Sequence, residues 1–243
     1  VVTVVVMVGV AEQRRPAGAN SPQGDSERPP GLPRNPLPDT VVLNTHAIEE
    51  VRVVTVARGL SHPWGMAFRQ TGDILITARD NGTLRVVRNG QLLDRAIPGV
   101  PEVFSESDRA GLMDVAVHPT DDRMVYLTYS KPIDRDGEPG VTVALARGRL
   151  DAGNLTEVRD IFVAQGLDRG IAASRLIWGP DDKLFMTVGG SYVFADTGSY
   201  AQDPSTHFGK LLRLNDDGTA VSDNPFSDDS SYLPEIYSMG PVS

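Results

Sequence analysis

Short apolar runs separated by turn residues dominate the chain from Thr40 onward. The runs are rich in valine, isoleucine and leucine, and Gly, Pro, Asn or Asp interrupts them every few residues. This spacing is typical of strands joined by tight turns and leaves little room for long amphipathic helices. The pattern therefore predicts an all-β fold for residues 40–243.

One phrase of this pattern, two apolar runs around a turn with a closing threonine, occurs three times. The copies are GMAFRQTGDILIT from Gly65, DVAVHPTDDRMVYLT from Asp114 and RLIWGPDDKLFMT from Arg175. Their closing threonines lie 51 and 59 residues apart, at Thr77, Thr128 and Thr187. Such a period is close to the length of a four-stranded propeller blade. An irregular β-sandwich is the alternative, and the repeat disfavours it.

Further apolar runs follow each copy of the repeated phrase. They begin at Thr83 and near Ala96 in the first unit, at Val141 and Val158 in the second, and at Gly209 and Pro234 in the third. We therefore expect three radially arranged units of about four strands each, which is part of a β-propeller. An open propeller exposes apolar faces on its terminal blades, so self-association through these edges is expected.

Antiparallel alternation divides the loops of such units between two rims. The loop that enters the first strand and the loop that joins the second strand to the third lie on the same rim. On this basis, functional residues are expected in segments 60–64, 79–81, 104–111, 130–140, 165–174 and 190–208. The TGD, HPTDD and GPDD turns belong to the opposite rim, where their acidic residues serve turn geometry.

The first 39 residues differ from the rest of the chain in composition and hydrophobic pattern. The apolar run VVTVVVMVGV is too short to span a bilayer as a helix, and with the small residues around it, residues 1–11 resemble the end of a secretory signal. A core strand is the alternative, since valine favours strands. Residues 12–38 hold seven of the 18 prolines, so 12–39 is interpreted as a solvated linker and 1–38 is expected to be irregular. This organisation favours a periplasmic or secreted protein.

Composition excludes several classes of function. A net charge of −9 without a basic stripe argues against nucleic-acid binding, and the absence of cysteine excludes thiol nucleophiles, thiolate metal sites and disulfides. Neither a Gly-x-Gly-x-x-Gly motif before a helix nor a Gly-x-Ser-x-Gly elbow occurs. Rossmann-type cofactor binding and elbow-type hydrolysis therefore lack support.

Six phrases, in order between residues 50 and 240, resemble the glucose and sorbosone dehydrogenase family. They are GLSHPWGMAF, GLMDVAVHP, SRLIWGPDDKLFMTVG, QDPSTHFGKLLRLNDDG, SDNPF and PEIYSMG. The resemblance implies the N-terminal half of a six-bladed propeller and a quinoprotein oxidoreductase that uses pyrroloquinoline quinone with calcium. Family members oxidise the anomeric hydroxyl of aldose sugars: a histidine base takes the proton and the quinone accepts hydride. The implied partners are a sugar and an electron acceptor.

The chain departs from the family pattern in three places. Ile171 stands where the family phrase His-Phe-Gly-Ser-Arg-Leu has its histidine base, and an aliphatic side chain cannot move a proton. Arg109 replaces the glutamine of a Gln-Gly-Gly phrase, and residues 241–243 replace His-Arg-Asn. The family's remaining quinone and calcium ligands lie in its second half. We therefore expect this chain alone to be an inactive fragment that binds neither cofactor. The alternative function is a non-catalytic binding module derived from such an enzyme.

Among the four histidines, His207 is the candidate for a substitute base. It lies on the expected functional rim, four residues after Asp203 and five after Gln202. The alternative is that it binds backbone groups before the next strand. The other three are His62 on the same rim with a packing or hydrogen-bonding role, His118 in a turn of the opposite rim, and His46 near the linker.

The acidic segments near residues 215–229 contain oxygen ligands of the type that calcium prefers. Their spacing does not match an EF-hand loop, because no Asp-x-Asp-x-Asp-Gly run with a closing glutamate occurs. NDDG is more simply a hairpin turn with Gly218 in the left-handed region. No metal ligand is therefore assigned in this chain.

Overall fold

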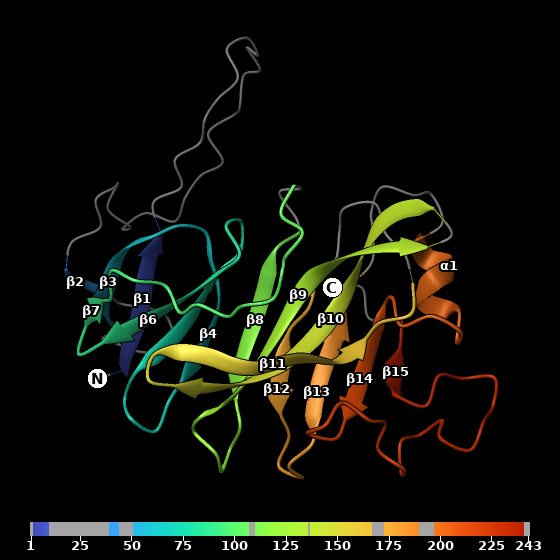
Figure 1. The fold of residues 1–243 in the computed structure, drawn as a ribbon. Helices are drawn as coiled ribbons and strands as arrows, with labels where there is room; N and C mark the ends of the chain where they lie inside the picture. The colour runs from blue at the N-terminus through green and yellow to red at the C-terminus, as the bar shows by residue number, and fades with distance from the viewer. Residues whose placement is uncertain are drawn as a thin grey trace, which may run out of the picture.

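The computed structural model describes residues 2–9, 39–43, 51–106, 110–135, 137–166, 173–189 and 197–240. These residues form three antiparallel four-stranded sheets and a smaller sheet at the N-terminal end (Figure 1). Their single helix is α1 (Thr197–Gln202), whose six residues are far too few to cross a bilayer. The predicted all-β class and the three four-stranded units are confirmed.

Each of the three sheets follows chain order, so every strand pairs with its neighbour in sequence. The first sheet consists of β4 (Pro63–Phe68), β5 (Ile74–Ala78), β6 (Thr83–Arg88) and β7 (Gln91–Leu92). The second consists of β8 (Leu112–Val117), β9 (Met124–Arg135), β10 (Glu138–Asp151) and β11 (Asn154–Val163). The third consists of β12 (Leu176–Trp178), β13 (Leu184–Val188), β14 (Lys210–Leu214) and β15 (Ile236–Met239).

The three sheets stand side by side with their first strands together. β4 packs against β8, and β8 packs against β12, so successive sheets share one inner edge. Two apolar cores fill the spaces between the sheets. One includes Leu75 and Leu127 between the first and second sheets, and the other includes Tyr126 and Leu212 between the second and third. Burial of a large apolar side chain contributes roughly 1.5–3 kcal/mol, so these cores hold the sheets together.

A fourth sheet forms from the N-terminal strands in the order β1-β3-β2. Its members are β1 (Val2–Gly9), β2 (Thr40–Leu43) and β3 (Val51–Leu60). β1 runs parallel to β3, whereas β2 is antiparallel to it. β3 covers the first sheet through Ala57 and Leu60, which pack with Ile74, Ile76 and Val87.

The prediction that residues 1–38 are irregular is therefore wrong for Val2–Gly9. A valine-rich run pairs readily when an apolar strand such as β3 offers a free edge. Residues 10–38 lie outside the described residues, so the linker remains a prediction. The interpretation of residues 1–11 as a signal remnant also remains a prediction.

Two local expectations also need correction. Residues 130–140, expected as a loop, belong to a long hairpin in which β9 and β10 stay paired as far as Arg135 and Glu138. Gly137 adopts a φ of 84° at the tip of this hairpin, and its N–H donates to Asp134 at 2.9 Å.

The stretch near Ala96 forms only an isolated bridge from Ile97 to Leu84, and the fourth strand of the first sheet is the earlier β7. Pro98 follows Ile97 and lacks the N–H that a longer strand requires.

Candidate functional site

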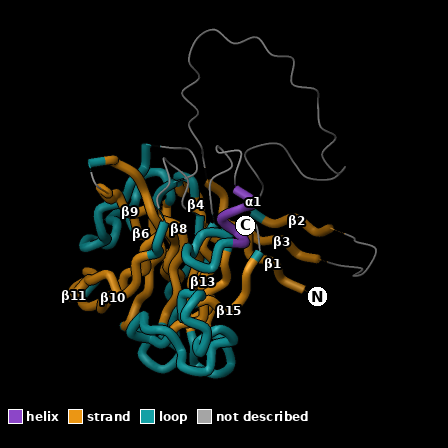
Figure 2. The backbone as a smooth tube through the Cα atoms, turned by 90° about the vertical axis from the view of Figure 1, so that its right-hand side faces the viewer, coloured by secondary structure: helices purple, strands orange, loops and turns teal. Residues whose placement is uncertain are grey.

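The loops divide between two rims, as the antiparallel alternation predicts. In Figure 1, the tip of the β9–β10 hairpin lies at the upper edge with α1 just below it at the right, and the turns β4–β5, β8–β9 and β12–β13 lie at the lower edge. Figure 2 shows the loops in teal at the ends of the orange strands. The upper edge is the rim on which functional residues were expected.

The three repeated threonines perform the same structural task in each sheet. The hydroxyl oxygen of each accepts the N–H of a residue on or just before the first strand of its own sheet. The pairs are Thr77 with Gly65 at 2.7 Å, Thr128 with Asp114 at 3.1 Å, and Thr187 with Arg175 at 2.9 Å. Gly65, Asp114 and Arg175 are therefore equivalent positions of successive blades. This equivalence, which the spacing of the threonines predicts, identifies the inner edge of the rim.

Asp114 connects these positions across the sheets. Its side chain is nearly buried, and its two oxygens accept the N–H groups of Val115 at 3.0 Å and of Leu176 in the next sheet at 2.8 Å. Arg175 lies 3.7 Å away. Burial raises the pKa of Asp114, although the two backbone donors and Arg175 oppose the shift. A Cβ at Gly65 would come within 2.3 Å of the Asp114 carboxylate, so only glycine fits there.

An aromatic ring between two guanidinium groups lies next to this inner edge. Arg79 is 4.5 Å and Arg175 is 5.1 Å from the centre of the Trp64 ring. Arg175 also donates to the Trp64 carbonyl at 2.8 Å. Trp64 remains 39% exposed. Cation–π contact at such distances stabilises each pair by about 0.5–2 kcal/mol. The result is a surface that combines an aromatic ring with two cationic groups.

His62 and Asp80 are in contact at the edge of this surface. His62 Nδ1 lies 2.8 Å from Asp80 Oδ2, and Arg79 donates to the other oxygen of Asp80 at 2.8 Å. The His62 side chain is 36% exposed, and the described residues provide no hydrogen bond to its Nε2. A carboxylate on Nδ1 with an open Nε2 is the arrangement that orients a general base. Sequence reasoning missed this pair because the partner lies 18 residues away along the chain.

His207 lies below the same rim but is 1% exposed. Its Nδ1 accepts the N–H of Gln165 at 2.8 Å, and its Nε2 lies 3.2 Å from Glu235. Hydrogen bonding to His207 lowers the pKa of Glu235. Asp203, the carboxylate expected beside His207, instead accepts from Ser205. Both ring nitrogens therefore hold structure in place, and the assignment of His207 as a base stays a prediction.

Lys210 fastens α1 to the third sheet. Its side chain is buried, and Nζ donates to the carbonyls of Tyr200 at 2.7 Å and Phe208 at 2.9 Å. Burial lowers the pKa of Lys210 to about 8, and the more distant Asp203 opposes the shift only in part. A charged lysine without a carboxylate in contact is costly to bury.

The acidic turns serve local geometry, as the sequence indicates. In the NDDG turn, Gly218 has a φ of 86° and Asp217 accepts the Thr219 N–H at 3.0 Å. Asp223 and Asp181 both bind Arg213 at 2.7 Å. On the lower rim, the His118 ring accepts the N–H groups of two turn residues, which confirms its role as a turn residue.

Several sequence-predicted positions lie outside the described residues. Ile171, Arg109 and His46 are among them, so their surroundings are not described. Ser174, in the same phrase as Ile171, is described: its hydroxyl is buried and has no hydrogen-bond partner among the described residues.

Comparison with known proteins identifies the family. The Glucose / Sorbosone dehydrogenase family profile matches residues 60–241. Aldose sugar dehydrogenase YliI of Escherichia coli is 32% identical over 197 residues, which cover 78% of this chain and 51% of that protein. An uncharacterised protein of Synechocystis sp. is 40% identical over 208 residues, or 79% of this chain and 49% of that protein. The chain thus spans about half the length of these curated relatives.

Solved structures agree with the sequence matches. The soluble aldose sugar dehydrogenase of Escherichia coli in its apo-form superimposes with a TM-score of 0.67 at 32% identity, over 76% of this chain and 52% of that one. The PQQ-bound aldose sugar dehydrogenase of Streptomyces coelicolor gives 0.63 at 27% identity, over 77% and 53%. The repeated blades, their common inner edge and these matches lead to one conclusion: this chain belongs to the glucose/sorbosone dehydrogenase family.

Proposed function

We propose that a full-length protein containing this chain is a quinoprotein that oxidises the anomeric hydroxyl of aldose sugars with pyrroloquinoline quinone. The observation that carries the proposal is the family match over residues 60–241, which includes all three four-stranded sheets. A relative named aldose sugar dehydrogenase and a PQQ-bound structural neighbour support both the substrate class and the cofactor.

The reaction removes two electrons and two protons from the sugar. The hydrogen on the anomeric carbon leaves as hydride, a base takes the hydroxyl proton, and the sugar becomes a lactone. The quinone supplies the hydride acceptor when it is bound. The protein must therefore hold the ring, exclude water and provide a base close to the anomeric hydroxyl.

The described rim residues fit part of this task. Arg79, Trp64 and Arg175 present an aromatic face and cationic groups, and the unpartnered Ser174 hydroxyl offers a further polar contact. This donor set suits a planar, carboxylate-bearing quinone. Among the described residues, no group of three or more histidine or acidic side chains could hold a metal ion, so no calcium ligand is assigned to them. No step is therefore assigned to a metal on these residues.

The family pattern does not identify a general base in this chain, because Ile171 stands where family members have the histidine base. His207 is the histidine that the sequence predicts, but its burial and two filled ring nitrogens oppose proton transfer to a sugar. His62 has the exposure, the carboxylate partner and the open Nε2 that the role requires. We therefore place His62 first and keep His207 as the competing hypothesis.

Export to the periplasm or the medium, and transfer of electrons from the quinone to a separate acceptor, are further parts of this proposal. The resemblance of residues 1–11 to the end of a secretory signal supports export, whereas the pairing of Val2–Gly9 with β3 speaks against it. A non-catalytic binding module is the second candidate function. No contact among the described residues favours it over the enzyme, and the same experiment tests both.

The test is aldose-dependent dye reduction by the purified full-length protein after addition of the quinone and calcium. We expect turnover with aldoses such as glucose, no turnover with the matching alditol, and loss of activity when either the quinone or calcium is omitted. An alditol lacks the anomeric hydroxyl and is the matched control. Quinone binding without turnover on any aldose would favour the binding module.

A further inference from the structure

A groove of about 600 Å³ separates the first and second sheets on the lower rim. The first sheet contributes residues 93–97 and the end of β6, and the second contributes the turn between β10 and β11. Val86, Ile97 and Leu150 supply apolar side chains to its lining. The β4–β5 and β8–β9 turns border it, so it lies on the rim opposite His62 and Trp64.

Positive charge predominates in this groove although the protein carries a net charge of −9. Four arginines and two aspartates line it, an excess of two positive charges, and Asp122 beside the groove pairs with one of these arginines, Arg69, at 2.8 Å. Asp73 is already engaged by two of the arginines. Arg88 binds its two oxygens at 2.8 and 2.6 Å, and Arg69 lies 3.7 Å from it. These contacts lower the pKa of Asp73, so it stays ionised and its negative charge is balanced by these arginines.

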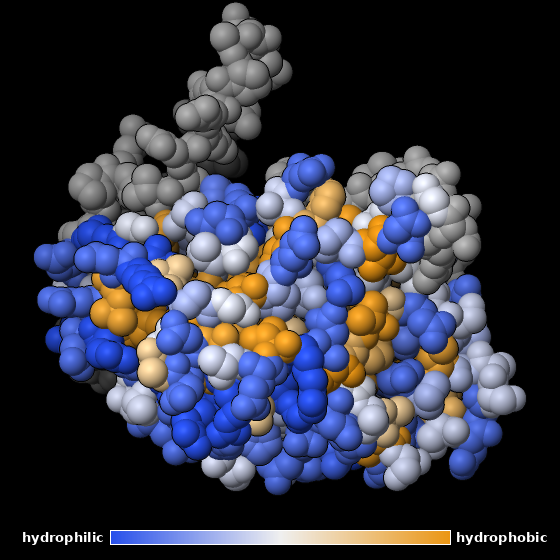
Figure 3. All heavy atoms as spheres, viewed as in Figure 1, coloured by the Kyte–Doolittle hydropathy of each residue, from blue (hydrophilic) through white to orange (hydrophobic). Residues whose placement is uncertain are grey.

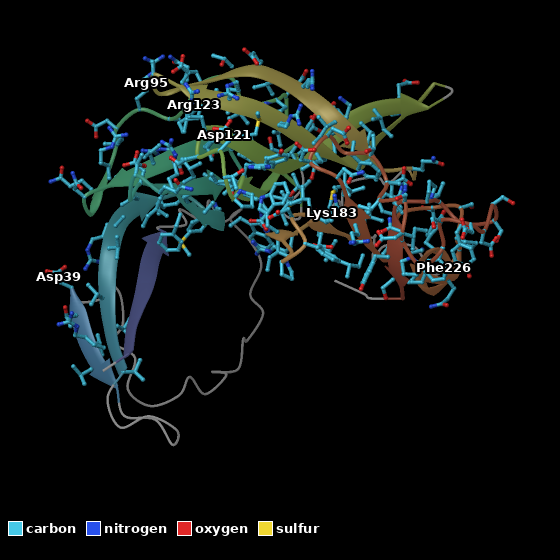
Figure 4. The ribbon with its side chains drawn as sticks, turned by 90° about the horizontal axis from the view of Figure 1, so that it is seen from below. Asp39, Arg95, Asp121, Arg123, Lys183 and Phe226 are labelled. Atoms are coloured by element: carbon cyan, nitrogen blue, oxygen red, sulfur yellow. The ribbon has the colours of Figure 1, made fainter. Side chains whose placement is uncertain are left out.

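The other two arginines, Arg95 and Arg123, have no hydrogen-bond or ion-pair partner among the described residues for their guanidinium groups. Both side chains are exposed and line the same groove. Figure 4, the view from below, shows them at the same end of the molecule near Asp121, whereas Lys183 lies over the third sheet. Asp121 accepts from Arg149 at 3.1 Å and from the backbone N–H of Arg123 at 3.1 Å, and the charge of Arg123 helps to lower its pKa, so Asp121 offsets part of the positive charge at this end of the groove. In Figure 3, deep blue hydrophilic residues gather at the lower left, around bands of orange.

We propose that this groove binds a small anion that carries a phosphate or carboxylate group beside a short apolar part. Arg95 and Arg123 supply the charge, because a guanidinium fork matches the oxygens of either group in a bidentate manner. Val86, Ile97 and Leu150 contact the apolar part. The site is separate from the sugar site proposed above, and its occupancy does not depend on the quinone.

The test is calorimetric titration of the protein with inorganic phosphate and, separately, with butyrate, at constant ionic strength set with sodium chloride. Arg95→Gln and Arg123→Gln are the test variants, since both residues are exposed and their loss leaves no buried group unpaired. Arg159→Gln is the matched control, because Arg159 is an exposed arginine of the second sheet outside the groove.

Saturable binding of at least one probe is expected, with affinity about tenfold lower or worse in each groove variant and unchanged in the Arg159 variant. Tighter binding of phosphate identifies a phosphate ligand, and tighter binding of butyrate identifies a carboxylate. Absence of saturable binding by both probes, or equal affinity in all three variants and the parent, would overturn the proposal. Melting curves of the variants confirm that the fold is intact.

Discussion

At the residue scale, the burial of Lys210 should make the folding stability depend on pH. The residue is 1% exposed, its Nζ donates to two carbonyls, and burial lowers its pKa to about 8 from an unfolded value of 10.5. Between these two values the unfolded chain binds more protons than the folded one. The contribution of Lys210 to the free energy of unfolding therefore rises with pH over that range. Burying a charged ammonium group is unfavourable, and deprotonation removes that charge.

The first prediction compares the parent with Lys210→Met, which keeps the length of the side chain and removes the charge. The difference in unfolding free energy, parent minus variant, should rise between pH 7.5 and 9.5 with a slope approaching about 1.4 kcal/mol per pH unit. Urea unfolding at three pH values measures it. A difference that stays flat or falls would show that the buried group does not titrate in this range.

The second prediction separates the two histidines on the functional rim. In a full-length protein, His62→Asn should lower kcat by about 10²–10⁴-fold. His207→Asn should instead lower the melting temperature, because Glu235 and the Gln165 N–H lose a buried partner. His118→Asn, on the lower rim, is the control and should leave kcat unchanged. The reverse outcome, with kcat lost only in the His207 variant, would restore His207 as the base.

At the scale of the element, the repeated threonines explain why the sheets could be predicted from sequence. Each phrase carries a strand, a turn and a strand within 13 to 15 residues, so local pattern suffices to find the strands. The pairing of β1 with β3 joins segments about 50 residues apart, and no local pattern reports it. The same reason hid the contact of His207 with Glu235, 28 residues further along the chain.

The third prediction tests the threonine anchor. Thr77 accepts the Gly65 N–H and donates to the Met113 carbonyl at 2.7 Å, so it joins the first sheet to the second. Thr77→Val keeps the shape and leaves both buried groups unpaired, which should cost about 1–3 kcal/mol for the lost partners. Thr187→Val is the control, since Thr187 accepts one N–H from the more exposed Arg175 and should cost less. Equal losses in the two variants would contradict the joining role.

At the scale of the whole molecule, the far face of the third sheet carries exposed apolar side chains among the described residues. One face of this sheet packs in the core, whereas Ile177 is 68% and Tyr237 is 39% exposed on the other. The fourth prediction is that this chain alone associates through such faces. Sedimentation should show association that grows with concentration, and Ile177→Lys should reduce it. A monodisperse monomer with a cooperative melt, unaffected by the change, would contradict this expectation.

The central claim is that the family chemistry operates in a full-length protein containing this chain. The most direct measurement is the absorption spectrum of the quinone-loaded, calcium-containing protein, recorded without oxygen or dye before and after addition of glucose. The account predicts that an aldose reduces one equivalent of bound quinone per protein, whereas the matching alditol leaves the spectrum unchanged. A bound quinone whose spectrum no aldose alters would contradict it.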